Sequence, residues 1–117
     1  MKVGIDILEV DRFNNMDADE MKRLFTQGEV FYLRSKNMSP ETAAGLFCAK
    51  EAFLKALGIG IVPSVFKEIE ITHDNSGVPS YNLTQSVIAK HHELENAQVC
   101  LSISHTKQTA VAVCIIS

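Results

Sequence analysis

The stretch from Ser39 to Gly58 constrains the fold most, because it carries the signals for both ends of one long helix. Ser39 is a suitable N-cap, Pro40 suits the first helical position, and Gly58 suits the left-handed residue after the last turn. Between these ends nearly every residue is small or apolar. A helix that is apolar around most of its circumference is normally buried. The sequence therefore predicts a long central helix with the remaining chain packed around it.

Three charged residues interrupt this apolar helix, namely Lys50, Glu51 and Lys55. Glu51 and Lys55 are four residues apart and share a face, whereas Lys50 points about a quarter turn away. A simple helical ion pair is one interpretation, but exposed pairs normally belong to a wide polar face, which this helix lacks. A buried carboxylate needs a partner or a metal ion to offset its desolvation. We therefore interpret Glu51 as a cation ligand and Lys55 as an anion contact.

Alternating apolar residues predict strands on both sides of the central helix. The predicted strands cover residues 2–8, 68–73, 78–83, 98–104 and 109–116. The final strand is apolar at almost every position, which indicates burial on both faces and a subunit interface over one of them. The chain is thus expected to form an α+β fold, with a small antiparallel sheet packed on the central helix, in a single domain over residues 1–117.

Shorter helices are predicted around this core. Residues 9–25 are weakly helical with a break at 14–19, and Thr26 and Glu29 form a capping box that opens a short helix to Arg34. Residues 84–96 are expected to form a helix with Val87, Ile88, His91 and Leu94 facing inward. The glycines at the start of the loop over residues 58–63 allow the backbone to approach a ligand closely, so Gly58 is a candidate binding residue.

Composition excludes several classes of protein. An apolar content of 46% indicates neither disorder nor a membrane protein, and no apolar run reaches membrane-spanning length. The N-terminus is too short and acidic for a signal peptide. A net charge of −3 argues against general nucleic-acid binding. Cys48, Cys100 and Cys114 show no metal-ligand spacing, so we expect reduced packing residues in a cytoplasmic protein.

Asp6 and His105 are the other candidate functional residues. Asp6 lies in the first predicted strand, where aspartate is disfavoured, so it is either a charge that protects an edge strand or a metal ligand. His105 lies at a strand end beside Thr106. Carboxylates without histidine or cysteine companions suit Mg²⁺, which fills its remaining coordination positions with water and substrate phosphate. Asp6, Glu51 and Lys55 together therefore suit a site that handles a diphosphate.

Several motifs in fixed order resemble the phosphopantetheinyl transferases, and in particular their short holo-[acyl-carrier-protein] synthase branch. The likeness is carried by residues 3–9 (Val-Gly-Ile-Asp-Ile-Leu-Glu), 47–58 (Phe-Cys-Ala-Lys-Glu-Ala-Phe-Leu-Lys-Ala-Leu-Gly), 69–71, 77–79 and 102–106. It extends over nearly the whole chain. Each motif is weak alone, but their joint order and spacing are specific.

The resemblance implies transfer of the 4′-phosphopantetheine group of coenzyme A to a serine of an acyl carrier protein, which supports fatty acid biosynthesis. Adenosine 3′,5′-bisphosphate would be released. Asp6 and Glu51 would ligate Mg²⁺, and Lys55 would contact the phosphates. Members of this branch form homotrimers through the sheet, with coenzyme A between neighbouring subunits.

The resemblance also implies where the nucleotide and the carrier bind. Gly77 and Pro79 would lie beside the adenine, and His105 with Thr106 near the 3′-phosphate. Glu51 or a water on the metal would accept the serine proton, and Glu9 is either a residue that orients this water or an ordinary surface acid. Arg12 is the expected contact for the acidic carrier.

Leu46 departs from the pattern of this branch, because many members have an arginine there that is read as a phosphate contact. Two other functions fit the same residues. One is a metal-dependent phosphodiesterase or nuclease, against which the low net charge and the lack of a basic stripe count. The other is a non-catalytic nucleotide-binding module in which Glu51 and Lys55 merely pair.

Overall fold

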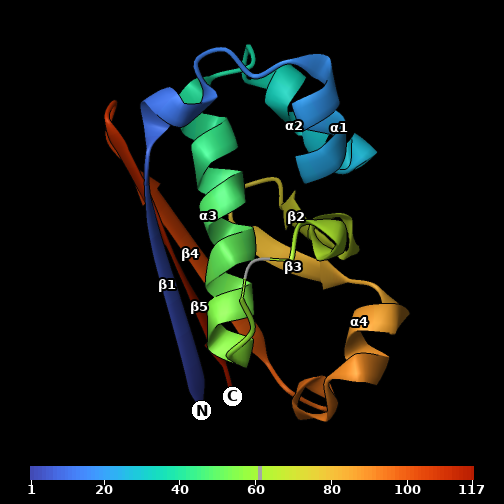
Figure 1. Cartoon of the computed structure of the whole chain (residues 1–117). Coiled ribbons are helices and arrows are strands. Elements are labelled where there is room, and N and C mark those ends of the chain that lie inside the picture. Colours follow the sequence, from blue (N-terminus) through green and yellow to red (C-terminus); the bar gives the residue numbers. More distant parts are fainter. Residues whose placement is uncertain (61) are drawn as a thin grey trace.

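The computed structural model describes residues 1–60 and 62–117, so position 61 of the predicted 58–63 loop lies outside the described residues. Figure 1 shows one long helix, α3, lying across a sheet, with shorter helices and a hairpin on its other side. The elements in chain order are β1 (Lys2–Glu9), α1 (Ala18–Leu24), α2 (Gln27–Ser35), α3 (Pro40–Leu57), β2 (Ile69–His73), β3 (Pro79–Leu83), α4 (Gln85–Lys90), β4 (Val99–His105) and β5 (Thr109–Ile116). Short 3₁₀ turns lie at Val10–Phe13, Pro63–Glu68 and His92–Leu94.

The main sheet is antiparallel and has the strand order β1-β5-β4. β2 and β3 form a separate antiparallel pair, and β3 lies beside β4 without joining its ladder. α3 packs on one face of the main sheet, against β1 and β5 (Figure 1). The α+β fold is therefore confirmed, and the ends of all five strands agree with the sequence-based ranges to within one residue.

The ends of α3 are those that the sequence predicts. The Ser39 hydroxyl accepts a hydrogen bond from the Thr42 N–H, and Pro40 is the first helical residue. Gly58 ends the helix in the left-handed conformation with φ of +75°, which glycine adopts without a Cβ penalty. Most of the helix between these ends is buried, so α3 forms the centre of the core.

Gly4 allows β1 to lie directly against α3. A Cβ atom at this position would be 1.9 Å from the Ala52 carbonyl oxygen and 2.5 Å from the Ala56 backbone nitrogen. Both obstacles are helix backbone and cannot rotate away. The strand and the helix thus approach each other closely because no side chain separates them, and this approach holds β1 beside the charged part of α3.

A buried ion pair joins α2 to α3. Lys50 Nζ donates hydrogen bonds to Glu29 Oε1 at 2.6 Å and to the carbonyl oxygens of Leu24 and Phe66 at 2.8 and 2.7 Å. Glu29 also completes the predicted capping box with Thr26 and accepts from the Ile71 N–H. Both charges are fully buried and hydrogen-bonded, so the pair ties α2 and α3 to the chain at Leu24, Phe66 and Ile71.

The face of the main sheet that points away from α3 is apolar along β1. Val3, Ile5 and Ile7 expose 58%, 58% and 69% of their surface. The register pairs them with Ile115, Val113 and Val111 of β5, which are half-buried. Within one chain β5 is therefore buried on one face and half-buried on the other, and the subunit interface expected over that face stays a prediction.

Two sequence-based predictions are wrong. The helix predicted over residues 84–96 ends at Lys90, because His91 has an extended backbone and only a 3₁₀ turn follows. Histidine is a weak helix former, and few buried contacts hold this polar stretch; Val87 and Leu94 are its buried residues. Cys100 is exposed on the outer face of β4, so only Cys48 and Cys114 are buried packing residues.

Candidate active site

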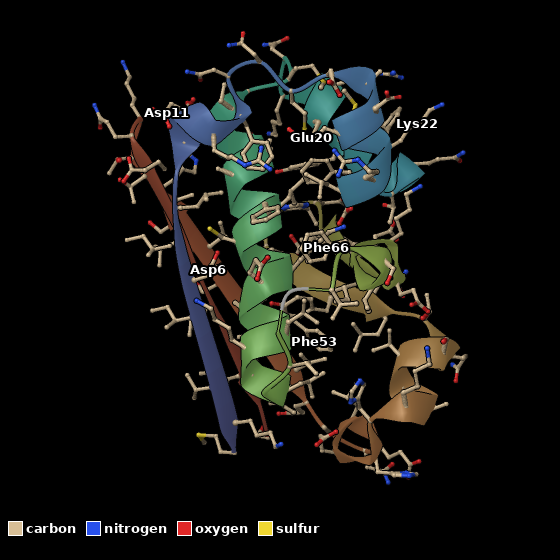
Figure 2. The ribbon with its side chains drawn as sticks, in the orientation of Figure 1. Asp6, Asp11, Glu20, Lys22, Phe53 and Phe66 are labelled. Atoms are coloured by element: carbon tan, nitrogen blue, oxygen red, sulfur yellow. The ribbon has the colours of Figure 1, made fainter. Side chains whose placement is uncertain are left out.

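Asp6 and Lys55 meet between β1 and α3. The alternation of β1 turns Asp6 toward the helix, opposite in direction to Ile5 and Ile7. Lys55 Nζ donates a hydrogen bond to Asp6 Oδ1 at 3.0 Å. Figure 2 shows Asp6 on the β1 side of α3, with Phe53 and Phe66 on the other side. Among the described residues Lys55 forms its salt bridge with Asp6 and none with Glu51, which contradicts a simple Glu51–Lys55 pair.

Glu51 carries a buried carboxylate that lacks a hydrogen-bond partner. The residue is 4% exposed, and within residues 1–60 and 62–117 its Oε1 atom is unsatisfied. Burial raises the pKa of Glu51, and the nearby negative charge of Asp6 raises this pKa further, while Lys55 lowers it. A buried, unpaired carboxylate is costly unless a cation or a proton neutralises it. Glu51 is therefore suited to a positive ligand.

Cys48 lies beside this acidic pair without sharing its chemistry. Its Sγ donates to the Ala110 carbonyl oxygen at 3.6 Å. Burial raises the pKa of the thiol to about 12, and the charge of Asp6 acts in the same direction. The raised pKa keeps the thiol protonated and makes it a poor nucleophile.

The donor set fits Mg²⁺. In the described part of the chain no group of three histidine, cysteine or carboxylate residues forms a metal site. Asp6 and Glu51 supply two carboxylates close enough for their charges to interact. Mg²⁺ is commonly held by one or two carboxylates together with water and substrate phosphates. The buried Oε1 atom and this oxygen-only pair match that preference.

A second feature is a cleft of about 210 Å³ on the other side of α3. It is lined by Tyr32, Glu41, Thr42, Gly45, Leu46, His73, Gly77, Pro79, Ile103 and His105. The structure thus brings together Gly77, Pro79 and His105, the residues expected near the adenine and the 3′-phosphate. Gly77 has φ of +87° in a turn where Asp74 Oδ1 accepts from the Ser76 and Val78 N–H groups. The turn brings Pro79 to the cleft.

Three other candidate residues lie outside this cleft. Gly58 is explained by its role as the C-cap of α3. The Thr106 hydroxyl accepts hydrogen bonds from the N–H groups of Gln108 and Thr109, each at 3.1 Å, and so shapes the β4–β5 turn. Glu9 is exposed and lies on the face of β1 opposite Asp6, so it does not approach Asp6 within its own chain. Nucleotide contacts by Gly58 and Thr106 stay predictions.

The two functional features lie on opposite sides of α3. Asp6 and Ile103 belong to one row of the main sheet, with Ala112 of β5 between them. Neighbouring strands are about 4.8 Å apart, so Asp6 and Ile103 are separated by roughly 10 Å. α3 runs from β4, where Gly45 approaches Ile103, to β1, where Ala52 approaches Gly4. One chain therefore carries the acidic pair and the cleft as two half-sites with the helix between them.

Sequence reasoning missed Tyr32 and His73 in the cleft wall. Their rings stack with centroids 3.8 Å apart and an angle of 4° between the planes. They come from α2 and β2, which are far apart in sequence. No local pattern marks either residue, since only the tertiary packing of α2 against β2 brings the two rings together.

No helix within the described residues is long and apolar enough to cross a membrane. The chain matches the family model described as the 4′-phosphopantetheinyl transferase superfamily over residues 2–114. A holo-[acyl-carrier-protein] synthase of Caldicellulosiruptor bescii is 47% identical over 115 residues, which cover 97% of this chain and 94% of the relative.

Solved structures agree with this match. The holo-(acyl-carrier-protein) synthase of Bacillus anthracis in complex with CoA (3′,5′-ADP) is 35% identical with a TM-score of 0.80, covering 98% of this chain and 94% of that one. The Helicobacter pylori holo-[acyl-carrier-protein] synthase in complex with coenzyme A is 30% identical with a TM-score of 0.81. The match covers 98% of this chain and 99% of that one. The sequence and the fold thus agree with the geometry of the site, and this chain belongs to the 4′-phosphopantetheinyl transferase superfamily.

Proposed function

We propose that this protein is a holo-[acyl-carrier-protein] synthase, which transfers the 4′-phosphopantetheine group of coenzyme A to a serine of an apo acyl carrier protein. Adenosine 3′,5′-bisphosphate is the second product, and the holo carrier serves fatty acid biosynthesis in the cytoplasm. The relatives named above carry this activity in their names, at up to 47% identity over most of the chain. The observation that carries the proposal is the meeting of Asp6, buried Glu51 and Lys55 between β1 and α3.

The residues of this site match the needs of phosphoryl transfer. The serine oxygen forms a bond to the β-phosphorus of coenzyme A, and the bond from that phosphorus to the bridging oxygen breaks as the bisphosphate leaves. Lys55 places positive charge against the phosphates, where negative charge develops. Asp6 and Glu51 would hold Mg²⁺, which neutralises diphosphate charge when it is bound. Glu51 is our candidate acceptor for the serine proton, through the carboxylate oxygen that would not be bound to the metal.

The separation of the two half-sites supports a homotrimer with shared active sites. Asp6 lies on β1 and the cleft lies at β4, so a coenzyme A molecule with its diphosphate at Asp6 would have to pass around α3 to reach the cleft of the same chain. The cleft of a neighbouring subunit avoids this obstacle. The apolar outer face of β1, with Val3, Ile5 and Ile7 exposed, is the surface that we assign to this association.

A groove of about 790 Å³ between α1 and α2 supports docking of the acidic carrier. Lys22, Arg34 and Lys67 line it together with Phe31, which is 77% exposed. Positive charge around an apolar anchor suits an acidic helical partner. Arg12, the contact expected from the sequence, pairs with Glu20 at 3.0 Å and lies over the Phe13 ring, so we give it a secondary role.

The decisive test is to mix the purified protein with apo carrier protein, coenzyme A and Mg²⁺ and to weigh the carrier. We expect the mass of the carrier to rise by one phosphopantetheine group, and Glu51→Gln to abolish this rise. No mass change with any divalent metal would refute the transferase. Mg²⁺-dependent cleavage of nucleic acid would favour the phosphodiesterase, and nucleotide binding indifferent to Glu51→Gln would favour a binding module.

A further inference from the structure

The stacked pair Tyr32 and His73 forms a wall of the cleft expected to hold the nucleotide. Both residues line this cleft, and both also line a second cleft of about 250 Å³ between α2 and β2. The two rings therefore form the partition between the clefts. They are nearly parallel, and Lys36 Nζ lies 5.6 Å from the centroid of the Tyr32 ring. This arrangement holds the plane of the imidazole in one orientation.

The His73 ring is available to a ligand. In the part of the chain that the structure describes, His73 makes no side-chain hydrogen bond, whereas Nδ1 of His105 lies 3.3 Å from the Thr106 carbonyl oxygen. His73 is half-buried, so its polar atoms have lost part of their contact with water. A stacked imidazole with free nitrogens is a directional hydrogen-bonding group. Because the fold already orders this ring, a ligand loses little entropy in fixing it.

The side chains of the cleft that could donate a hydrogen bond to an anion include two imidazoles. Among its described lining residues there is no lysine or arginine, and His73 and His105 are the groups able to carry positive charge. They come from different strands, β2 and β4. Leu46 is apolar and buried at 2% exposure, and Glu41 is the one acid in the described lining.

The identity of the anion follows from the proposed function, on which this inference rests. Coenzyme A carries a diphosphate and a separate phosphate monoester at the 3′ position of its ribose. The diphosphate belongs at Asp6, Glu51 and Lys55. The cleft of the neighbouring subunit is then left for the nucleotide end, where the 3′-phosphate is the remaining anion.

We propose that His73, held in place by its stack on Tyr32, determines specificity for the 3′-phosphate by donating a hydrogen bond to it. The imidazole thereby supplies a contact that the Leu46 side chain cannot make. His105 contacts the same phosphate from the opposite strand. The protein thus distinguishes coenzyme A from its 3′-dephospho form mainly through these two rings.

The charged groups around His73 are consistent with this role. Burial lowers its pKa, the positive charge of Lys36 lowers it further, and Asp74 in the adjoining turn raises it. Glu41 and His105 line the same cleft. The lowered pKa favours the neutral imidazole in the free protein, which donates from one nitrogen. A bound phosphate dianion favours the protonated ring and strengthens the hydrogen bond.

The test compares coenzyme A with 3′-dephospho-coenzyme A as substrates of the intact protein, with apo carrier and Mg²⁺. For His73→Ala we expect kcat/KM with coenzyme A to fall by about tenfold or more, which is the usual value of a hydrogen bond to a charged group. With 3′-dephospho-coenzyme A the change in kcat/KM should stay within about twofold. The ratio of kcat/KM between coenzyme A and its 3′-dephospho form should therefore decrease. His73→Gln, which keeps a donor, should recover part of the ratio.

Tyr32→Ala removes the ring that holds His73 in place and should resemble His73→Ala. His92→Ala, an exposed histidine far from the cleft, is the matched control. Titration with adenosine 3′,5′-bisphosphate and with adenosine 5′-monophosphate measures the same contrast without catalysis. The proposal is overturned if His73→Ala lowers kcat/KM equally for both substrates. It is also overturned if the wild type has the same kcat/KM for both. If the wild type turns over neither substrate, the proposed function itself has failed.

Discussion

Lys55 Nζ lies 3.0 Å from Asp6 Oδ1, so the lysine occupies one of the two carboxylates that would ligate the metal. A cation that binds the free protein must compete with this ammonium group. A phosphate of coenzyme A offers the lysine another partner and leaves Asp6 to the metal. We therefore expect the metal and coenzyme A to bind together and with positive coupling.

Lys55→Met should separate the competition of Lys55 with the metal from its contact with the phosphates. Without the competing ammonium group, the free protein should bind Mn²⁺ more tightly, as measured by electron paramagnetic resonance of the unbound ion. The transfer rate should fall by about 10²–10³-fold, since a charge that stabilises the transition state is lost. Lys90→Met, at an exposed position on α4, should change neither quantity. Unchanged Mn²⁺ affinity in Lys55→Met would contradict the competition.

Gly4→Ala should be severely destabilising. The new methyl group would meet α3 backbone at 1.9 and 2.5 Å, and neither neighbour can rotate away. We expect a loss of at least about 3 kcal/mol in the free energy of unfolding, the upper end for overpacking. Urea denaturation followed by circular dichroism measures it. Gly60→Ala, where the new Cβ meets none of the described residues within 4 Å, is the control and should be nearly neutral.

Lys50→Met should be destabilising because it leaves the buried Glu29 carboxylate without its counter-charge. The expected loss is about 3–5 kcal/mol in the free energy of unfolding. The double variant Glu29→Gln with Lys50→Met removes both charges and should recover part of this loss. A single variant as stable as wild type in chemical denaturation would mean that water or a proton replaces the lysine at little cost.

Ile5→Lys should weaken the proposed trimer. The substitution places a charge in the centre of the apolar outer face of β1, where the native side chain is 58% exposed. Sedimentation velocity should show a shift toward monomer, and the transfer activity should fall in parallel because the half-sites no longer meet. Met38→Lys, an exposed apolar position outside the sheet, should leave the assembly intact. A wild-type protein that sediments as a monomer would refute this assembly.

Reversal of charge along the α1–α2 groove should weaken binding of the carrier but not of coenzyme A. Lys22→Glu combined with Arg34→Glu is expected to raise KM for the carrier by about tenfold while KM for coenzyme A stays constant. The wild-type KM for the carrier should rise with salt, and the variant should respond less, because screening acts on exposed charges. Lys90→Glu controls for the overall change in charge. If the double variant and the wild type have the same KM for the carrier, the docking surface lies elsewhere.

The sequence specifies α3 and the strands well because their signals are local. Ser39, Pro40 and Gly58 each satisfy the ends of the helix with their own backbone or side chain. Strand positions follow from alternation within single segments. Asp6 and Glu51 were found for a related reason, since a charge inside an otherwise apolar element needs an explanation.

Features that depend on contacts between distant segments were not predictable in this way. Glu29 looked like a capping residue alone, yet it also neutralises Lys50 across 21 residues of sequence. The stack of Tyr32 on His73 and the contact of Gly4 with α3 likewise arise from tertiary packing. The helix predicted to Asn96 ends early because its polar second half makes few buried contacts.

The alternation of β1 places two different functions on consecutive residues. Asp6 points toward α3 and the proposed metal site, while Ile5 and Ile7 point to the surface that we assign to assembly. Deleting or inserting one residue within Lys2–Glu9 would exchange these directions, burying an acid between subunits and turning a hydrocarbon toward the phosphates. This strand is therefore intolerant of changes in length, and homologues should vary in length at loops such as the Asp74–Gly77 turn instead.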